Sequence, residues 1–294
     1  MNLILIKKAF ATIEFDMYAL YRFVEAYSHI NRESMFKIRK NGIFIEETDP
    51  SRIVLISIIL NNNSYKFLRD GEVTLNLDDL EALLKCQSKD KTGVRFPFGE
   101  KCLYLDLYSK KFCSSINRSL LALDSKIEET HFEELKNLGY AGIFSLNKTQ
   151  LNYILRNLGL YSEVVTLVQN PQEVIFKEIG SIGEQNINFS KERLKICTID
   201  FSSVQESLEE ESNKTYKNII DTKTLSGTYS LSFFNIIGKI ASILTNKDQI
   251  SFELFTDFPL HALMQLSELG DSQVNYYIAP RTEEAEFDED EDEF

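Results

Sequence analysis

The chain repeats one structural pattern twice, and this duplication constrains the fold more than any other feature of the sequence. Segment 71–85, G-E-V-T-L-N-L-D-D-L-E-A-L-L-K, corresponds to segment 227–241, G-T-Y-S-L-S-F-F-N-I-I-G-K-I-A. In both segments an alternating strand pattern passes into a short amphipathic helix at the same offset. Two copies are too few for a solenoid. We therefore predict a duplicated domain in a chain of 294 residues, a length that suits two domains.

Each copy shows the same order of predicted elements: a strand, a short helix, several further strands, a second helix and more strands. The first helices follow Asp16 and Asn147, and the second helix of the first copy follows Asp78. Such side chains cap helix N-termini. The Asn-Gly pair at 41–42 predicts a tight hairpin turn. Hairpin spacing is typical of antiparallel sheets, so we predict an α+β fold.

The two copies differ in length and are joined by a polar connector. Residues 15 and 71 are 56 positions apart, whereas the matching residues 146 and 227 are 81 apart, so the second copy holds 25 more (81 − 56). We predict that these residues form an extended, polar surface loop at 202–223. The expected organisation is an N-terminal domain at 1–116, a connector at 117–138, a C-terminal domain at 139–282 and an acidic disordered tail at 283–294.

The net charge of −13 comes mostly from that tail. Residues 283–293 hold nine acidic side chains, and without them the formal charge is −13 + 9 = −4. Acidic runs of this kind are usually solvated and disordered. The nearly balanced body therefore does not exclude nucleic acid as a partner.

Basic side chains recur on the polar faces of the short helices. Lys148, Asn152 and Arg156 follow one another at intervals of four, opposite a stripe of leucines. Asn235 and Lys239 are arranged in the same way on the last helix. A solvated helix surface and non-specific contact with a phosphate backbone both explain this pattern. The spacing alone leaves both interpretations open.

The sequence contains no recognised catalytic motif. GxxxxGK[ST], GxGxxG after a strand, GxSxG and HExxH are all absent. The histidines are dispersed and the cysteines lack metal-ligand spacing, so we expect non-catalytic imidazoles and buried free thiols at His29, His131, His261, Cys86, Cys102, Cys113 and Cys197. We therefore expect no enzymatic activity, no metal and no cofactor. A metal-dependent DNA-processing enzyme is the alternative from a different class.

Apolar runs are short throughout the chain. None approaches the roughly 20 residues of a membrane-spanning helix. The clearest run, I-V-L-I-S-I-I-L at 53–60, is typical of a buried strand, and the apolar segment 1–6 is too short for a signal peptide. These patterns predict an intracellular protein without membrane contact.

Three segments, in this order and spacing, resemble one known family. The first is G-I-F-I-E-E-T-D-P-S-R-I-V-L-I-S-I-I-L at 42–60, and the second ends in L-L-K-C at 83–86. The third begins with F-P-L at 258–260 and closes with Y-Y-I-A-P-R at 276–281, followed by the acidic tail. This combination is similar to the proliferating cell nuclear antigen family, the DNA sliding clamps of eukaryotes and archaea. Together with the repeat, the resemblance covers nearly the whole chain.

The resemblance implies the DNA clamp fold: two similar domains, each with antiparallel sheets outside and two short helices facing the interior of a ring. Such a ring is a homotrimer, or a heterotrimer in a replicative or damage-checkpoint clamp. Its subunits would join through strand edges at 102–111 and 186–190. Duplex DNA would pass through the ring and contact basic residues of the inner wall without reading bases. By position these are Arg22, Lys85, Lys148, Arg156 and Lys239.

The resemblance also implies a processivity factor that tethers DNA polymerase, the clamp loader, ligase and flap nuclease. It would act in the nucleus of a eukaryote, or in the cytoplasm and nucleoid of an archaeon. Each partner would insert a short hydrophobic peptide into a pocket beside the connector. Carried over by position, that pocket comprises Thr48, Arg52, Ile53, Leu55, Leu135, Pro259, Tyr277, Ile278, Ala279 and Pro280. Thr48 stands where the family commonly has a larger apolar residue, which would retune the pocket.

Overall fold

The computed structural model describes residues 9–85, 92–99, 102–109, 114–124, 135, 138–202, 204 and 219–281. Several predicted features lie outside these residues: Cys86, Cys113, His131, most of the connector, most of the 202–223 loop and the acidic tail. Of the loop, Val204 is buried and residues 219–222 form a helical turn. Among the described helices, none is long and apolar enough to cross a membrane.

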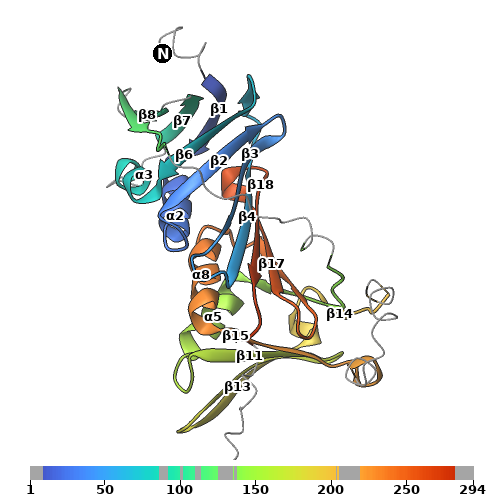
Figure 1. Ribbon diagram of the computed structural model, residues 1–294. Coiled ribbons are helices and arrows are strands. Elements are labelled where there is room, and N and C mark those ends of the chain that lie inside the picture. The colour runs from blue at the N-terminus through green and yellow to red at the C-terminus, as the bar shows by residue number, and fades with distance from the viewer. Residues whose placement is uncertain are drawn as a thin grey trace, which may run out of the picture.

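The strands form three antiparallel sheets (Figure 1). One sheet has the order β5-β1-β7-β8-β9, with bounds β1 (Ala9–Asp16), β5 (Lys66–Phe67), β7 (Thr92–Gly99), β8 (Cys102–Ser109) and β9 (Ser114–Leu121). A sheet at the opposite end of the molecule has the order β13-β12-β11-β15, with bounds β11 (Val164–Gln169), β12 (Glu173–Gly180), β13 (Gly183–Ser190) and β15 (Leu225–Ser230).

A nine-stranded sheet lies between them and combines strands of both copies, in the order β14-β10-β16-β17-β18-β4-β3-β2-β6. The strands from the first copy are β2 (Glu33–Arg39), β3 (Gly42–Thr48), β4 (Val54–Leu60) and β6 (Gly71–Asn76). Those from the second copy are β10 (Gly142–Asn147), β14 (Cys197–Ile199), β16 (Gln249–Leu254), β17 (Leu260–Leu266) and β18 (Ser272–Ile278). Short 3-10 turns are η1 (Lys191–Arg193) and η2 (Ser267–Leu269). Pairing of β18 with β4 joins the two copies.

The four described α-helices lie along one side of this central sheet (Figure 1): α2 (Met17–Tyr27), α3 (Leu77–Leu84), α5 (Lys148–Asn157) and α8 (Leu231–Ala241). Each begins at the residue after a strand ends, so one short segment supplies both a strand of a sheet and the helix that follows it. The predicted α+β fold, with antiparallel sheets and two helices per copy, is confirmed.

The helix caps follow the sequence prediction with one exception. The Asp16 carboxylate accepts hydrogen bonds from the N–H groups of Tyr18 and Ala19, both at 3.0 Å. Asn147 forms a capping box with Gln150. Asp78 does not cap α3, because that helix begins earlier and Asn76 accepts the N–H of Asp79. Asp78 instead lies in the first turn, where the helix dipole favours an acid.

Alternating burial defines two faces of the central sheet. In β3, Ile43, Ile45 and Glu47 are buried toward the helices, whereas Phe44 and Glu46 are partly exposed on the other face. We call these the inner and outer faces. The inner face and the helices share one apolar core. Both described cysteines are free thiols; Cys197 is buried and Cys102 is half-buried.

Glu47 is a carboxylate in that core, and three donors satisfy it. Its Oε2 accepts from the Tyr27 hydroxyl at 2.6 Å and the Asn31 amide at 2.9 Å, and its Oε1 accepts from the Met35 N–H at 2.8 Å. Burial and the Glu47 charge raise the pKa of Tyr27 well above its ordinary value. Glu47 therefore fixes the end of α2 against strands β2 and β3.

We predict that Glu47→Ala lowers the free energy of unfolding by about 2–3 kcal/mol, because the buried Tyr27 hydroxyl and two half-buried donors lose their acceptor. Urea unfolding followed by circular dichroism measures the change. Glu72→Ala, which removes only the exposed ion pair with Arg39, should cost less than about 1 kcal/mol. Equal effects of the two substitutions would contradict this role for Glu47.

Candidate functional site

A row of side chains crosses four strands on the outer face of the central sheet. Thr48 on β3 lies opposite Leu55 on β4, Leu55 lies opposite Tyr277 on β18, and Tyr277 lies opposite His261 on β17. Cross-strand partners share one face of a sheet and lie close together. Thr48, Leu55 and Tyr277, three residues predicted for the pocket, are therefore neighbours although more than 200 positions separate Leu55 and Tyr277 in sequence.

The turn before β4 adds an exposed apolar side chain, Ile53, two residues before Leu55 of this row. The Asp49 carboxylate accepts the N–H groups of Ile53 at 2.7 Å and Val54 at 2.6 Å. Arg52 adopts a positive φ of 58°, which completes the turn. Ile53 is 38% exposed, and its carbonyl accepts the N–H of Ala279 at 2.8 Å. The turn thus holds Ile53 beside the chain segment that leaves β18.

The remaining predicted pocket residues are placed unequally. Pro259 and Pro280 are half-buried, at the start of β17 and after the end of β18. Ile278 is completely buried, because alternate residues of a strand face opposite sides and its side chain faces the core instead of the outer row. Leu135 is half-buried within the connector, and its described contact is a hydrogen bond from Leu138 N–H to its carbonyl.

Two aromatic rings that sequence reasoning did not assign to the site pack against this row. His261 stacks on Tyr277 with ring centroids 4.4 Å apart and planes 8° apart. The Tyr140 ring lies 6.0 Å from His261, and its hydroxyl donates to the Pro259 carbonyl at 3.0 Å. Tyr140 lies just before the first strand of the second copy, and His261 directly follows the F-P-L segment. Their position beside these recognised segments is the sequence signal that could have identified them.

Polar contacts fix these rings. His261 Nδ1 lies 2.8 Å from a Glu253 carboxylate oxygen, and its Nε2 lies 3.1 Å from the Asn275 side-chain oxygen. Burial, followed by the charge of Glu253, raises the pKa of Tyr277 to about 12. Burial also raises the pKa of Tyr140 strongly. Both phenols therefore remain protonated at neutral pH.

The five basic residues predicted to face DNA divide into two groups. Lys85, Arg156 and Lys239 are exposed on the helix side of the molecule, in or just after the last turns of α3, α5 and α8. Arg22 and Lys148 instead form internal contacts. Helix C-termini favour cations, so the exposed group occupies electrostatically favourable positions.

The internal contacts converge on the C-terminus of α8. Lys148 donates from its ammonium group to the carbonyls of Ser242 at 2.5 Å and Leu244 at 3.1 Å. Arg22, from the other copy, donates to the Ser242 hydroxyl at 2.9 Å and pairs with Glu25 at 2.8 Å. These two cations join α2, α5 and α8 and are less available to an external ligand.

Within the described residues, each of the two outlying sheets ends in a strand that is paired along one edge only; β9 and β13 are such strands. Strand β8 does not provide an edge, because it lies between β7 and β9; the expectation for 102–111 is therefore wrong, and the edge belongs to β9. At the other end, β13 pairs with β12 and with no other strand among the described residues, which places the predicted segment 186–190 on an edge. Exposed apolar side chains accompany both edges: Ile116, Leu121, Leu160, Ile179 and Ile182.

Comparison with known proteins defines the class of this fold. The structure of proliferating cell nuclear antigen from Thermococcus kodakaraensis superposes with a TM-score of 0.75 at 17% identity, covering 92% of this chain and 100% of that one. The corresponding protein of Entamoeba histolytica gives 0.73 at 17% identity, covering 93% and 100%. The chain therefore has the fold of a DNA sliding clamp.

Comparison of the amino-acid sequence shows which proteins this chain resembles. Residues 13–95 match the family model described as proliferating cell nuclear antigen, N-terminal domain. Proliferating cell nuclear antigen 2 of Drosophila melanogaster is 24% identical over 274 residues, covering 91% of this chain and 96% of its own length. The DNA polymerase sliding clamp of Pyrococcus horikoshii is 24% identical over 265 residues, covering 89% and 94%. The predicted resemblance to a sliding clamp of the proliferating cell nuclear antigen type is confirmed.

We predict that Lys148→Met lowers the free energy of unfolding by about 1–2 kcal/mol, because the carbonyls at the end of α8 lose a charged donor. Arg156→Met, an exposed change on the same helix, should alter it by less than about 0.5 kcal/mol. Thermal and urea unfolding measure both values. A Lys148 variant as stable as the Arg156 variant would contradict the structural role of Lys148.

Proposed function

We propose that the chain is a subunit of a ring-shaped DNA sliding clamp, a non-enzymatic processivity factor that encircles duplex DNA and tethers DNA polymerase. The observation that carries this proposal is the clamp fold itself. Its four described helices lie on one side, and within the described residues its two outlying sheets end in strands that are paired along one edge only. We place the domains at 1–116 and 139–282, joined by the connector 117–138; strand β9 continues into the first residues of that connector.

Ring closure through β9 and β13 would satisfy the exposed strand edges. Unpaired edges invite association, and a strand of another copy completes the missing hydrogen bonds. Ile116 and Leu121 on β9 are 54% and 74% exposed, and Ile182 beside β13 is 79% exposed. Head-to-tail contacts of this kind generate a closed ring when the rotation between copies allows it. Three copies, or three paralogous subunits, would form the six-domain ring.

The helix side would then form the inner wall. Lys85, Arg156 and Lys239 are the exposed cations available to phosphate groups, and such contacts do not read sequence. A ring around DNA does not dissociate when individual contacts break, so few and weak contacts are sufficient. A protein with this role would act where chromosomal DNA is replicated, in the nucleus or the nucleoid.

The outer row would receive partner proteins. Ile53 and Leu55 provide an apolar surface for a short hydrophobic peptide above the buried ring of Tyr277, with Pro259 and Ala279 at its border. Binding through such a peptide raises the effective concentration of a polymerase at the primer end. The same surface would serve the clamp loader, ligase and flap nuclease in turn. The alternative function, a metal-dependent enzyme, has less support, because no group of three or more metal-ligating side chains occurs among the described residues.

We predict that the purified chain has the mass of a trimer and, once loaded, remains on nicked circular DNA but leaves the same DNA after linearisation. Light scattering and gel filtration of the loaded complexes measure both. Ile182→Asp should reduce the mass to that of a monomer, because it places a charge against an apolar partner edge. A monomer that no paralogous subunit converts into a ring would overturn the proposal, whereas closure only with paralogues would indicate the heterotrimer.

We predict that Ile53→Ser abolishes stimulation of DNA polymerase while the trimer mass is retained. Ile53 is exposed in a turn, so its loss removes apolar contact with a partner and little packing. Tyr277→Ala should have the same functional effect with a larger loss of stability, because Tyr277 is only 4% exposed. Leu68→Ser, at another exposed apolar residue, is the control and should stimulate normally. Full stimulation by the Ile53 variant would contradict the pocket assignment.

A further inference from the structure

The helix side of the molecule carries different charges in the two copies. Helices α2 and α5 begin 131 residues apart (148 − 17), and α3 and α8 begin 154 residues apart (231 − 77). Positions are matched here from these first residues, which for α3 and α8 shifts the sequence alignment of 71 with 227 by two residues. Glu25 of α2 then corresponds to Arg156 of α5. The same position of the fold thus holds an acid in one copy and a base in the other.

The second helices differ in the same direction. Their matched positions are Asp78 with Ser232, Glu81 with Asn235, and Lys85 with Lys239. Two neutral side chains of the second copy therefore stand where the first copy has acids, whereas both copies have the lysine. Asp78 and Lys85 are exposed, and so are Ser232 and Lys239. The difference thus lies on the surface that would face DNA.

The net charges of the helices consequently have opposite signs. Segments 17–27 and 77–85 of the first copy hold two basic and four acidic residues (2 − 4 = −2). Segments 148–157 and 231–241 of the second copy hold three basic residues and no acid (+3).

The loops before the second helices do not remove this contrast. They are held alike, because Leu77 N–H donates to the Arg32 carbonyl. Leu231 N–H donates to the Glu163 carbonyl in the same way. Arg32 and Glu33 cancel each other in the first copy, whereas Glu163 lowers the total of the second to 3 − 1 = +2.

The acids of the first copy lie close together between α2 and α3. The Tyr21 hydroxyl donates to Glu25 at 3.3 Å, and the Ser28 hydroxyl donates to Glu81 at 3.3 Å. Burial, followed by the charges of Glu25 and Glu81, raises the pKa of Tyr21, so both carboxylates act on one hydroxyl. Arg22 pairs with Glu25 at 2.8 Å and compensates one of the two charges.

Lys85 stands beside these acids. Glu81 and Asp78 precede it by four and seven residues, which correspond to about 6 and about 10 Å along a helix. Neither distance exceeds the Debye length of about 10 Å at 0.1 M salt, so the acids also act on a phosphate that approaches Lys85. We therefore expect Lys85 to contribute little to DNA binding although it is exposed.

Arg156 and Lys239 lie in the opposite environment. A Cβ atom added to Gly238 would lie 2.2 Å from Leu155 Cδ1, so α5 and α8 are closely packed at this point. Arg156 and Lys239 directly follow Leu155 and Gly238 and are both exposed. Neither helix contains an acidic residue. These two cations can therefore act together on one phosphate backbone.

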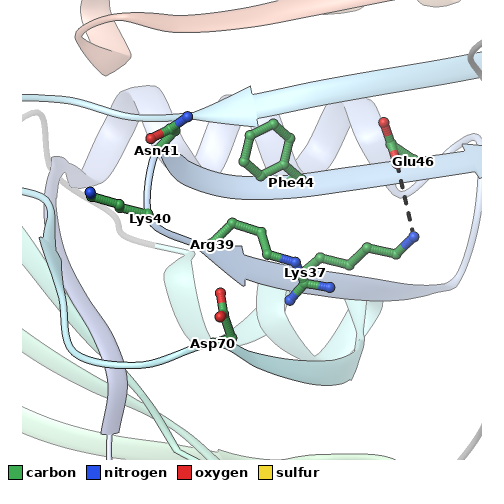
Figure 2. Close-up of a pocket in the computed structure, with 7 residues that line it drawn as sticks. All are labelled: Lys37, Arg39, Lys40, Asn41, Phe44, Glu46 and Asp70. Atoms are coloured by element: carbon green, nitrogen blue, oxygen red, sulfur yellow. Dashed lines mark ion pairs between the residues drawn. The ribbon is translucent and has the colours of Figure 1, made fainter.

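Basic side chains also line a depression on the outer face, at the turn between β2 and β3 (Figure 2). Arg39 pairs there with Glu72 at 2.7 Å, and Lys37 lies 3.9 Å from Glu46. The lining and these partners hold three basic and three acidic residues, so the depression has no basic excess. The helix side of the second copy is the better site for a polyanion.

We propose that duplex DNA is bound by α5 and α8 of the second copy and repelled by α2 and α3 of the first. This inference rests on the proposed clamp function and narrows its DNA contact to half of the helix side. In a ring of three chains the two kinds of domain alternate, so each basic second copy faces an acidic first copy across the central hole. Attraction and repulsion then act in the same direction and hold the duplex off the ring axis, against α5 and α8.

The test uses the assembled ring and two forms of one DNA sequence, a short linear duplex and a covalently closed minicircle. Only the linear duplex has an end that can enter a closed ring, so the difference in affinity reports binding inside the ring. Fluorescence anisotropy gives each Kd between about 25 and about 200 mM salt, because phosphate contacts make log K depend linearly on log salt. Light scattering checks that each variant keeps the mass of the ring.

We predict that Arg156→Gln and Lys239→Gln each weaken binding of the linear duplex about threefold or more at low salt and reduce the salt slope. Lys85→Gln, at the position that matches Lys239, is the control and should change the Kd less than about 1.5-fold. Each variant loses one exposed positive charge, so an effect of net charge alone would make all three equal.

We further predict that removing two exposed acids of α3 tightens binding. Asp78→Ser combined with Asp79→Asn should lower the Kd about threefold at low salt. In this background Lys85→Gln should weaken binding about threefold, although it has little effect in the unaltered chain. The difference between the two backgrounds measures how strongly the acids mask the lysine.

Equal losses for Lys85→Gln and Lys239→Gln, or no gain from removal of the two acids, would overturn the proposed asymmetry while leaving the clamp function intact. If the ring does not bind the linear duplex more tightly than the minicircle, the clamp function fails, and this inference with it. All the substituted side chains are exposed, and retention of the ring mass excludes loss of assembly as the cause of weaker binding.

Discussion

Pairing of β4 with β18 is the interaction on which the rest of the structure depends. Six residue pairs, from Gln273 with Ile59 to Ile278 with Val54, fuse the two copies into one nine-stranded sheet. The same register places Leu55 beside Tyr277, so the outer row exists only because the two copies share a sheet. Through one set of backbone hydrogen bonds, the chain thus obtains both its rigidity and its candidate partner surface.

The two faces of this sheet carry different chemistry. Its inner face is covered by helices whose exposed cations suit a polyanion, and its outer face offers apolar and aromatic side chains. Not every basic side chain on the helix side is available to a ligand. Lys148 and Arg22 bind the end of α8, and the Arg22 contact links the first copy to the second. Some basic side chains of the helices therefore stabilise the fold, whereas others remain exposed to a ligand. Only the contacts seen in the structure distinguish the two groups.

Local patterns in the sequence predicted the duplication and the α+β fold, because alternation and helical spacing are short-range signals. The members Thr48, Leu55 and Tyr277 of the outer row were instead assigned by position through the family resemblance. Asn76 replaced Asp78 as a cap because α3 begins one residue after Asn76. The free edge at β9 was not predictable, since β8 also alternates and only pairing distinguishes an inner strand from an edge. His261 and Tyr140 were missed for the same reason: their stacking partners come from other strands.

The central position of β18 has a consequence for synthesis of the protein. Asn61 and Ser272, which hydrogen-bond where β4 and β18 meet, are 211 positions apart. On the ribosome, β4 emerges early and its edge stays open until almost the entire polypeptide has been made. An open edge in a nascent chain is prone to wrong pairing, and non-local strand pairing is slow. A product terminated before β18 (Ser272–Ile278) would lack the strand that joins its halves, so the central sheet forms only after translation has passed that strand.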